Sequence, residues 1–185
     1  PELLARLVGE VPTRGDPARG EALFRRAGLD CMKCHAIGGS GGLVGPDLTS
    51  LGGAAQIDYL FESLVRPNKA VKENYHSNVI ITKRGEVLTG VPIASAKESV
   101  TLRTAEGEER TISTGAILKR EISGSIMPAG LVDALTESEL IDLVRFLSSL
   151  GTTTEYSISK AAVARRWRQL ETKSESLTGS DVEKV

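Results

Sequence analysis

Apolar residues recur at helical spacing in three separate stretches of the chain. The first stretch reads GDPARGEALFRRAG, with Asp16 as a capping residue, Pro17 at the first helical position and Gly28 as a stop. Its apolar positions are Ala22, Leu23, Phe24 and Ala27. The pattern predicts a short helix just before the sequence CMKCH.

Two further helices are predicted later in the chain. One runs from Ala54 to Val65 with apolar residues at helical spacing, and Pro67 ends it. The other lies in LTESELIDLVRFLSSLG, where Thr136 and Glu139 make a capping box and Gly151 follows as a stop. Its apolar stripe consists of Leu140, Leu143, Val144 and Leu147.

The hydrophobic pattern is different between residues 76 and 122. β-Branched residues become frequent there, and glycine turns separate short runs such as NVIIT, VLTGVPI, SVTLRT and RTIST. These runs predict a meander of four or five strands, enough for a small barrel or a curled sheet. We therefore expect a mainly α fold with a small, barrel-like all-β subdomain inserted before the last helix.

The predicted organisation has three parts. Residues 13–75 and 122–150 form one helical domain, and residues 76–121 form the inserted β subdomain. Residues 151–185 hold a polar linker, a basic amphipathic helix in SKAAVARRWRQLE and a loose charged tail. That helix contains Trp167, the only tryptophan, and needs a partner to bury its apolar side. We expect it to pack on the insertion or to join two chains in a homodimer.

Composition narrows the class of protein. The chain has 185 residues, 40% hydrophobic and 25% charged, which fits a soluble globular protein. Its formal net charge of −1 argues against binding to nucleic acid, and the β stretch mixes basic with acidic residues. No apolar run approaches the roughly 20 residues that span a bilayer. The chain opens PELLARLVGE, without an initiator Met or a signal peptide, so we expect a mature product or a fragment.

The sequence CMKCH holds the only two cysteines, Cys31 and Cys34, and one of the two histidines, His35. On a helical turn these three side chains project to one side. Two thiols can then bond to one haem while an imidazole reaches its iron, and C-x-x-C-H is the known pattern for c-type haem attachment. The motif therefore predicts one covalently bound haem c. Aromatic residues are only 4% of the chain, and a haem could fill part of the core in their place.

Other uses of this cysteine pair have weaker support. A zinc site needs about four protein ligands, and beyond His35 the chain offers only His76 and no further cysteine. A thioredoxin-like redox pair expects a βαβ setting, whereas a glycine-rich loop follows here. A structural disulfide between residues so close in sequence would close too small a loop to stabilise much.

The iron would need a sixth ligand or an open face. Apart from His35, the candidate side chains are Met32, Met127 and His76. The helical turn directs Met32 away from the haem. Met127 lies in SIMPAG, where Pro128 stiffens the loop, and a thioether opposite an imidazole suits electron transfer. We favour Met127 as the ligand, with His76 as the alternative; the other interpretation of Met127 is an ordinary core residue.

The run GDPARGEALFRRAGLDCMKCHAIGGSGGLVGPDLTSLG, together with SIMPAGLVDALTESELIDLVRFLSSL, resembles a class I cytochrome c domain. More narrowly, it is similar to haem-binding modules found in Planctomycetes and Verrucomicrobia, often as part of larger exported proteins. The resemblance covers about residues 13–150. It implies that Cys31 and Cys34 form thioethers with the haem. His35 would be the proximal iron ligand and Met127 the distal one.

The resemblance also implies two structural features and has one departure. The proline of the G-P-D-L loop, here Pro46, would direct its carbonyl at the imidazole N–H of His35 and so orient the ring. The first and last helices would cross at a small residue beside an aromatic, here Gly20 and Phe24 against Phe146 or Leu147. A minimal cytochrome c has nothing like residues 76–121. The insertion would shield a haem edge, or alternatively dock a redox partner or move the Met loop.

We therefore expect an electron-transfer protein and not an enzyme: a monohaem c-type cytochrome, or the cytochrome domain of a larger exported dehydrogenase. Redox proteins would be its partners. The resemblance implies the periplasm, because covalent haem attachment occurs outside the bacterial cytoplasm. The alternative is a gas sensor or peroxidase-like site in which Met127 or His76 leaves the iron, and a third is an assembly module with a structural haem. Arg66 could pair with a haem propionate, or be an ordinary solvated side chain.

Overall fold

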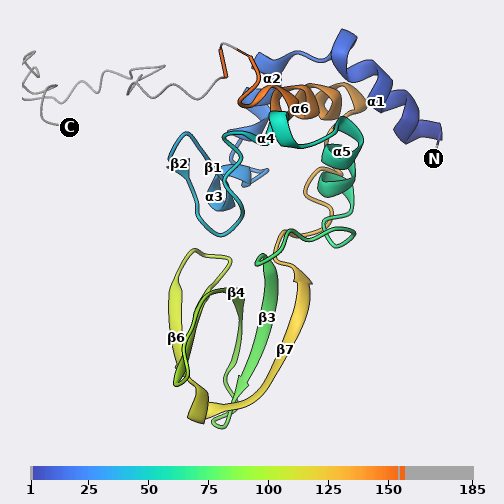
Figure 1. Ribbon diagram of the computed structural model, residues 1–185. Coiled ribbons are helices and arrows are strands. Elements are labelled where there is room, and N and C mark those ends of the chain that lie inside the picture. Colours follow the sequence, from blue (N-terminus) through green and yellow to red (C-terminus); the bar gives the residue numbers. More distant parts are fainter. Residues whose placement is uncertain (1, 154, 157–185) are drawn as a thin grey trace, which may run out of the picture.

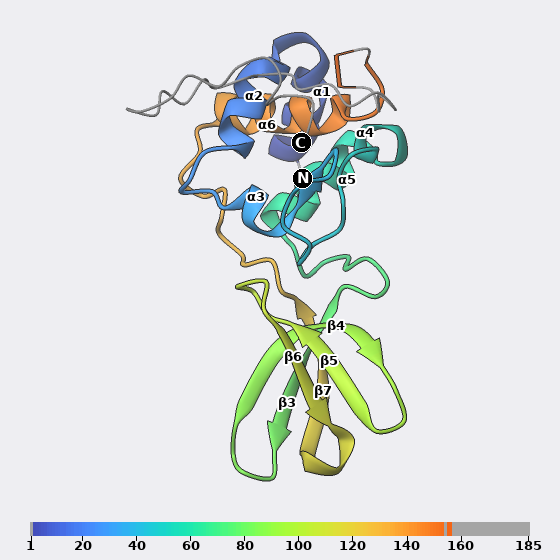
Figure 2. The same cartoon turned by 90° about the vertical axis from the view of Figure 1, so that its left-hand side faces the viewer.

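The chain folds into a helical part and a β part, which lie at opposite ends of the molecule (Figures 1 and 2). The computed structural model describes residues 2–153, 155 and 156. Both ends of this range form the helical part, and the middle forms the β part. The architecture is a mixed α/β fold, with the sheet inserted between two helices as the sequence predicts.

The described residues form six α-helices: α1 (Glu2–Arg14), α2 (Pro17–Phe24), α3 (Cys31–Cys34), α4 (Leu51–Ala54), α5 (Ile57–Val65) and α6 (Glu137–Ser149). A two-stranded sheet consists of β1 (Ala36–Ile37) and β2 (Ser40–Gly41). The larger sheet consists of β3 (His76–Thr82), β4 (Val87–Ser95), β5 (Ser99–Arg103), β6 (Glu109–Ser113) and β7 (Ile117–Ser125). A 3₁₀ turn, η1 (Thr114–Ala116), joins β6 to β7.

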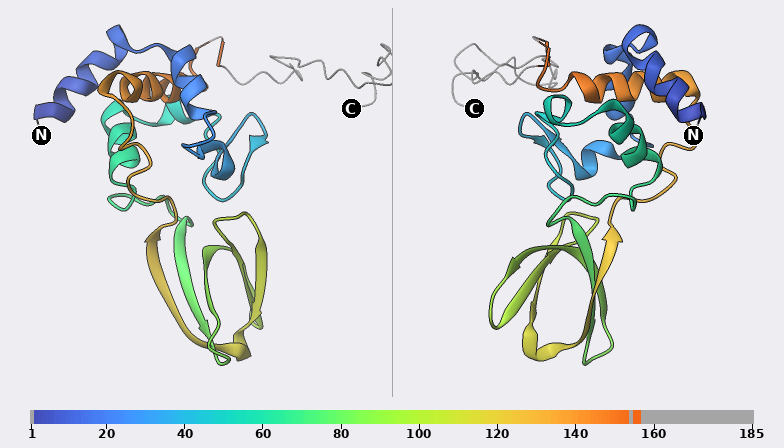
Figure 3. Two further views of the ribbon diagram at one scale, coloured as in Figure 1. Left: turned by 180° about the vertical axis from the view of Figure 1, so that it is seen from behind. Right: turned by 45° about the vertical axis from the view of Figure 1, so that its right-hand side comes forward.

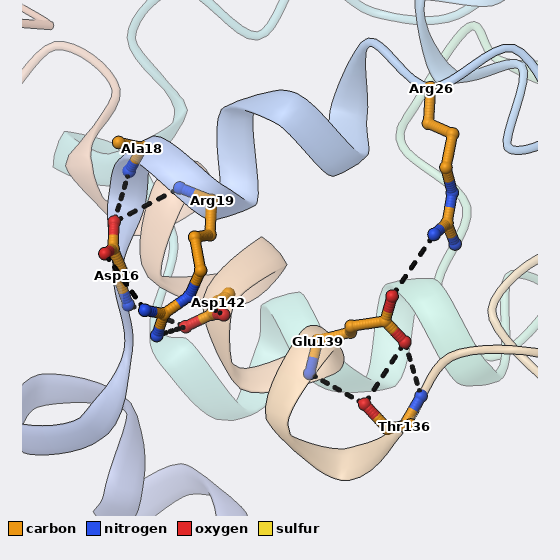
Figure 4. A network of polar contacts seen from close by, with 7 residues as sticks. All are labelled: Asp16, Ala18, Arg19, Arg26, Thr136, Glu139 and Asp142. Atoms are coloured by element: carbon orange, nitrogen blue, oxygen red, sulfur yellow. Dashed lines mark hydrogen bonds and ion pairs between the residues drawn. The ribbon is translucent and has the colours of Figure 1, made fainter.

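Two of the predicted helix starts are confirmed. The carboxylate of Asp16 accepts hydrogen bonds from the backbone N–H groups of Ala18, at 2.8 Å, and Arg19, at 3.1 Å, and so caps α2. α6 begins with the predicted capping box between Thr136 and Glu139. Figure 4 shows both caps, which satisfy N–H groups that would otherwise lack a partner at the helix start.

The other helices differ from the sequence prediction. The helix expected over residues 54–65 corresponds to α5, which begins only at Ile57 because Ala55 and Gln56 have extended backbone, and α4 just before it is not predicted. α1 is not predicted at all, since Gly9 and Pro12 weaken its helical pattern. It nevertheless lies beside α6 and α5 and buries its apolar side there.

α2 and α6 cross in close contact. A Cβ atom on residue 20 would lie 2.0 Å from the carbonyl oxygen of Asp142 and 2.7 Å from Cβ of Phe146, so the approach requires Gly20. Phe24 packs beside this point, with its ring centroid 5.6 Å from that of Phe146. The predicted contact of Gly20 and Phe24 with Phe146 is therefore confirmed.

Asp142 stabilises the same crossing from a buried position, with 3% of its surface exposed. Its carboxylate accepts hydrogen bonds from Nε of Arg19 and from the backbone N–H of Asp16, both at 2.7 Å (Figure 4). Burial alone would raise the pKa of Asp142, but these hydrogen bonds and the Arg19 charge lower the pKa below its usual value. The buried carboxylate is therefore ionised and fully paired at neutral pH.

The core of the helical part lies between α6 and the other helices. Its most buried side chains are Val11, Phe61, Ile141, Leu143, Val144, Phe146 and Leu150. Met127 and Cys31 are only partly buried and pack against the edge of this cluster. The core therefore supports the CMKCH turn and the SIMPAG loop from one side.

The barrel expected for the β subdomain does not form. The strand order is β6-β5-β4-β3-β7, all antiparallel, so β6 and β7 are edge strands that do not pair with each other. Closure would require these edges to meet. The sheet buries a small apolar cluster, Ile80, Val100, Leu102 and Ile112. A closed barrel would therefore bury little additional apolar surface, and the sheet remains open.

Among the described residues, hydrogen bonds join the β part to the rest of the chain at the ends of β7 and β5, where the sheet approaches the helical part (Figure 3). At the end of β7, the backbone N–H of Ser125 donates to the side-chain oxygen of Asn68 at 2.8 Å. At the end of β5, Nη1 of Arg103 donates to the backbone carbonyl of Leu43 at 2.8 Å. The turn between β5 and β6 therefore reaches the glycine-rich loop that follows CMKCH.

Some sequence predictions lie outside the described residues. These are the basic amphipathic helix with Trp167, the charged tail and the homodimer formed through that helix. In the portion of the chain that the structure describes, every helix is too short or too polar to cross a bilayer.

Candidate functional site

One apolar cavity of about 280 Å³ brings together the residues singled out in the sequence. Cys31, Cys34, His35, Pro46 and Met127 all line it. The rest of its wall is mostly aliphatic and aromatic, including Phe24, Val44, Leu48, Leu60, Leu64, Leu131, Leu143 and Leu147. A larger cavity, of about 440 Å³ at the far end of the sheet, contains none of the predicted site residues.

The CMKCH segment has the helical turn that the spacing predicts. α3 spans Cys31–Cys34, and the backbone N–H of His35 donates to the carbonyl of Cys31 at 2.9 Å. Asp30 precedes the turn in left-handed backbone, with φ of 53°. This local fold places both thiols and the imidazole on the wall of the same cavity.

The two thiols are free and protonated at neutral pH. Burial raises the pKa of Cys31 to about 11. Burial also raises the pKa of Cys34, with the carboxylates of Asp30 and Glu106 adding to the effect and the charge of Lys33 opposing it. A redox-active pair normally has a lowered thiol pKa, so this environment does not favour the thioredoxin-like alternative.

The His35 ring is fixed by a carbonyl oxygen. Nδ1 lies 2.8 Å from the oxygen of Pro46, and because a carbonyl only accepts, the proton of the neutral ring resides on Nδ1. Burial lowers the pKa of His35, while the hydrogen bond to Pro46 opposes that shift. The ring is thus neutral at neutral pH, and Nε2 keeps a lone pair for a metal.

Gly45 is a site residue that the sequence analysis missed. A Cβ atom there would lie 2.5 Å from Cε1 and 2.8 Å from Nδ1 of His35, so the imidazole packs directly on the glycine backbone. The backbone N–H of Gly45 also donates to the carbonyl of Cys34 at 2.8 Å. In the sequence, the only indication of its role is that Gly45 comes immediately before Pro46.

Met127 reaches the cavity from the loop that follows β7. Its backbone N–H donates to Oγ of Ser125 at 3.1 Å, which fixes the start of the loop. The side chain is half-buried, and its neighbours Ile126 and Pro128 line the same cavity. The structure therefore brings Met127 and His35 to one cavity, although 91 intervening residues separate them in sequence.

The other candidate ligands lie elsewhere. Met32 does not line the cavity, and its sulfur lies 3.4 Å from Nη1 of Arg25. His76 is exposed at the start of β3, opposite Ser125, and does not line the cavity either. Arg66 is exposed and likewise absent from the cavity wall. Of the candidates considered, only Met127 shares a cavity with His35.

Polar side chains that the sequence analysis missed also line the cavity. Tyr59, Ser63, Lys72 and Tyr75 come from α5 and from the segment that leads to β3. Nζ of Lys72 lies 5.9 Å from the centroid of the Tyr75 ring. These hydroxyl and ammonium groups could donate to an anionic part of a ligand whose body occupies the apolar space.

The β part contributes to the cavity as well. Ala105, in the turn between β5 and β6, lines it, and Arg103 anchors this turn to Leu43. Nη2 of Arg103 also pairs with Glu109 at 2.6 Å, which ties together the two strands that flank the turn. The inserted sheet thus covers one edge of the cavity beside CMKCH.

Within the described residues, no group of three or more His, Cys, Asp or Glu side chains could hold a metal ion. The described residues therefore offer no further ligands that could complete a zinc site with Cys31, Cys34 and His35. In comparisons with protein-family models and with curated proteins, no family model and no curated protein matches this chain.

Proposed function

We propose that this chain is a monohaem c-type cytochrome, or the cytochrome domain of a larger exported protein, that transfers single electrons. One observation carries the proposal: Cys31, Cys34, His35 and Met127 line a single apolar cavity. Two thiols, an imidazole and a thioether are the donor set that a covalently bound, His/Met-ligated haem requires. The apolar wall suits the body of a porphyrin, and the residues present fit that group.

Each cavity residue has a distinct role in this proposal. The Cys31 and Cys34 thiols would each add across one vinyl group. In each addition the S–H bond and the vinyl π bond break and a C–S bond and a C–H bond form, so neither an oxidant nor a leaving group is needed. His35 would bind iron through Nε2, and Met127 would bind it through its thioether. The carbonyl of Pro46, 2.8 Å from Nδ1, would hold the ring orientation and raise its basicity.

The same residues favour electron transfer over catalysis. The bound haem would supply a one-electron couple between ferrous and ferric iron, and His35 and Met127 would both hold the iron. Among the cavity-lining residues that the structure describes, His35 is the only histidine and none is an arginine. Peroxide chemistry would need further distal acid–base groups, so this wall does not favour the peroxidase-like alternative.

The arrangement of helices supports a class I cytochrome c fold as part of the proposal. α2 and α6 cross at Gly20 and Phe24, and the CMKCH turn lies just after α2. The sheet between α5 and the Met127 loop would be an insertion that covers the cavity edge. Covalent attachment implies an extracytoplasmic location, the periplasm, and redox proteins as partners.

The test of this proposal is covalent attachment. The chain is produced together with the machinery that attaches haem c, denatured and extracted with acidified solvent. The pigment should remain with the wild-type polypeptide and be lost in a Cys31→Ser, Cys34→Ser double variant. Pigment that extracts from the wild type, or a wild type that takes up no haem, would refute the proposal.

A further inference from the structure

β7 is a long edge strand with one free side. Six of its nine residues pair with β3, with Ile80 opposite Arg120 and Ile81 opposite Lys119, and the register shifts on either side of this stretch, at Leu118 and at Ser123 and Gly124. Among the described residues, no strand pairs with its other side. Figure 1 shows β7 at the outer margin of the sheet, away from the helices. Unpaired N–H and C=O groups on such an edge can bind another strand.

The side chains of β7 are also unusually exposed for a strand of this length. Leu118 is 68% exposed and Ile122 is 76% exposed. Natural sheets usually protect edges with short strands, proline, β-bulges or charged side chains, and β7 carries two register shifts and the charged residues Lys119, Arg120 and Glu121. β7 contains no proline, and its Lys119 is already paired with Glu121 at 2.7 Å. The exposed Leu118 and Ile122 leave apolar surface on β7 that a second strand could cover.

The sequence of β7 is complementary to itself. Around Arg120 it reads Leu118, Lys119, Arg120, Glu121, Ile122. If two copies pair antiparallel about Arg120, Lys119 lies opposite Glu121 of the second copy, and Leu118 lies opposite Ile122 of the second copy. Each contact occurs twice by symmetry. Opposite charges and apolar pairs placed directly across an antiparallel ladder are stabilising.

The one like-charged pair in this register is already restrained. Arg120 would lie opposite Arg120 of the second copy, but its Nε donates to Oδ1 of Asn78 at 2.6 Å. Asn78 belongs to β3 and is buried, so this hydrogen bond draws the guanidinium across its own sheet, away from the free edge.

We propose that two copies of this chain associate through β7, in antiparallel register about Arg120, to form one continuous sheet. In one chain the helical part lies at one end of the sheet (Figures 1 and 3), so a two-fold operation that reverses the strand direction places the two helical parts at opposite ends of the joint sheet. This proposal does not depend on haem binding. A pairing of so few residues buries less than the roughly 1,600 Å² of a standard interface, so the dimer should be weak and concentration-dependent.

Charge reversal on β7 tests this proposal. Sedimentation equilibrium of the full chain should show a monomer–dimer equilibrium for the wild type. The substitution Lys119→Glu places a second carboxylate opposite Glu121 of the other copy, and should weaken dimerisation at least tenfold. Lys119→Glu with Glu121→Lys restores opposite charges across the edge and should restore the dimer. Arg110→Glu, on the other edge strand, is the matched control and should leave the dimer unchanged.

Circular dichroism of each variant should match that of the wild type, which shows that lost association is not caused by unfolding. A further variant, Ile122→Lys, should also dissociate the dimer while the fold is retained. A wild type that is monomeric at all concentrations would overturn the proposal. So would a dimer that withstands Lys119→Glu and Ile122→Lys, since the partner surface must then lie elsewhere, for example after residue 156.

Discussion

Nδ1 of His35 lies 2.8 Å from the carbonyl oxygen of Pro46, across a loop whose glycine packs against the imidazole face. The hydrogen bond holds the proton on Nδ1, and Gly45 fixes how closely the backbone and ring can approach. The loop after CMKCH therefore fixes the orientation of the imidazole through contacts within the protein.

Gly45→Ala should disturb this arrangement directly. The added methyl group would lie 2.5 Å from Cε1 of His35, so either the ring or the loop must move. We expect the free energy of unfolding to fall by about 1–3 kcal/mol, as for other overpacked sites. The fraction of chains that carry low-spin haem should also fall. Thermal unfolding and absorption spectra measure the two effects.

Gly53→Ala is the matched control, because the nearest atom to its added methyl group lies at an ordinary contact distance of 3.8 Å. It should leave the spectrum and stability close to wild type. An equal effect of the two substitutions would show that the contact between Gly45 and His35 is not the cause.

Gly20→Ala should destabilise the crossing of α2 and α6. The new Cβ would lie 2.0 Å from the carbonyl oxygen of Asp142, which belongs to the α6 backbone and cannot rotate away. The expected loss is about 1–3 kcal/mol in chemical denaturation. Gly9→Ala, in open space on α1, should instead stabilise by roughly 0.5–1 kcal/mol through helix propensity. If both variants behaved alike, the close approach of the helices would be disproved.

Asp142 should make stability depend on acidic pH. Its pKa is lowered in the folded protein, so its contribution is present above the unfolded value, near 3.8, and is lost as pH falls through the folded value. Asp142→Asn should lower stability at neutral pH by about 1–3 kcal/mol, as expected for a hydrogen-bonded charged group. The difference between wild type and variant should narrow as the pH is lowered below about 4. A difference that stayed constant with pH would contradict this account of Asp142.

The anchor between the sheet and the glycine-rich loop should respond to Arg103→Ala. Nη1 of Arg103 donates to the carbonyl of Leu43, and that contact holds the β5–β6 turn over the cavity edge. We expect faster amide hydrogen exchange in residues 41–45 and a stability loss of about 0.5–1.5 kcal/mol.

Arg110→Ala provides the comparison for Arg103. Arg110 lies on the neighbouring strand, and its partner Glu86 is about as exposed as Arg110 is, so the loss should be below about 1 kcal/mol. Exchange in residues 41–45 should stay at the wild-type rate. Equal exchange in the two variants would show that the sheet does not hold the loop.

The sequence predicts the local parts of the fold well. Asp16 caps α2, Thr136 and Glu139 form a capping box, and CMKCH forms one helical turn, because each depends on neighbours within four residues. The runs NVIIT, VLTGVPI, SVTLRT and RTIST are found for the same reason and correspond to β3 to β6, whereas β7, which extends to Ser125, is not among the runs named.

Long-range features could not be predicted in this way. Whether the sheet closes into a barrel depends on how much apolar surface closure would bury, and the pattern of strands and turns in the sequence does not predict that amount. The placement of α4 and of α1 depends on packing against α6. Lys72 and Tyr75 look like ordinary loop residues in sequence, and only the folded chain places them on the wall of the cavity.

On the proposed function, His35 and Met127 would both ligate the iron of one covalently bound haem. Absorption spectra of the ferrous protein with and without carbon monoxide test it most directly, in the wild type and in Met127→Ala, with Met32→Ala as the matched control. The wild type and Met32→Ala should be low-spin and unresponsive to the gas, whereas Met127→Ala should bind it. A wild type that binds carbon monoxide readily, or a Met127→Ala variant that remains unresponsive, would contradict the claim.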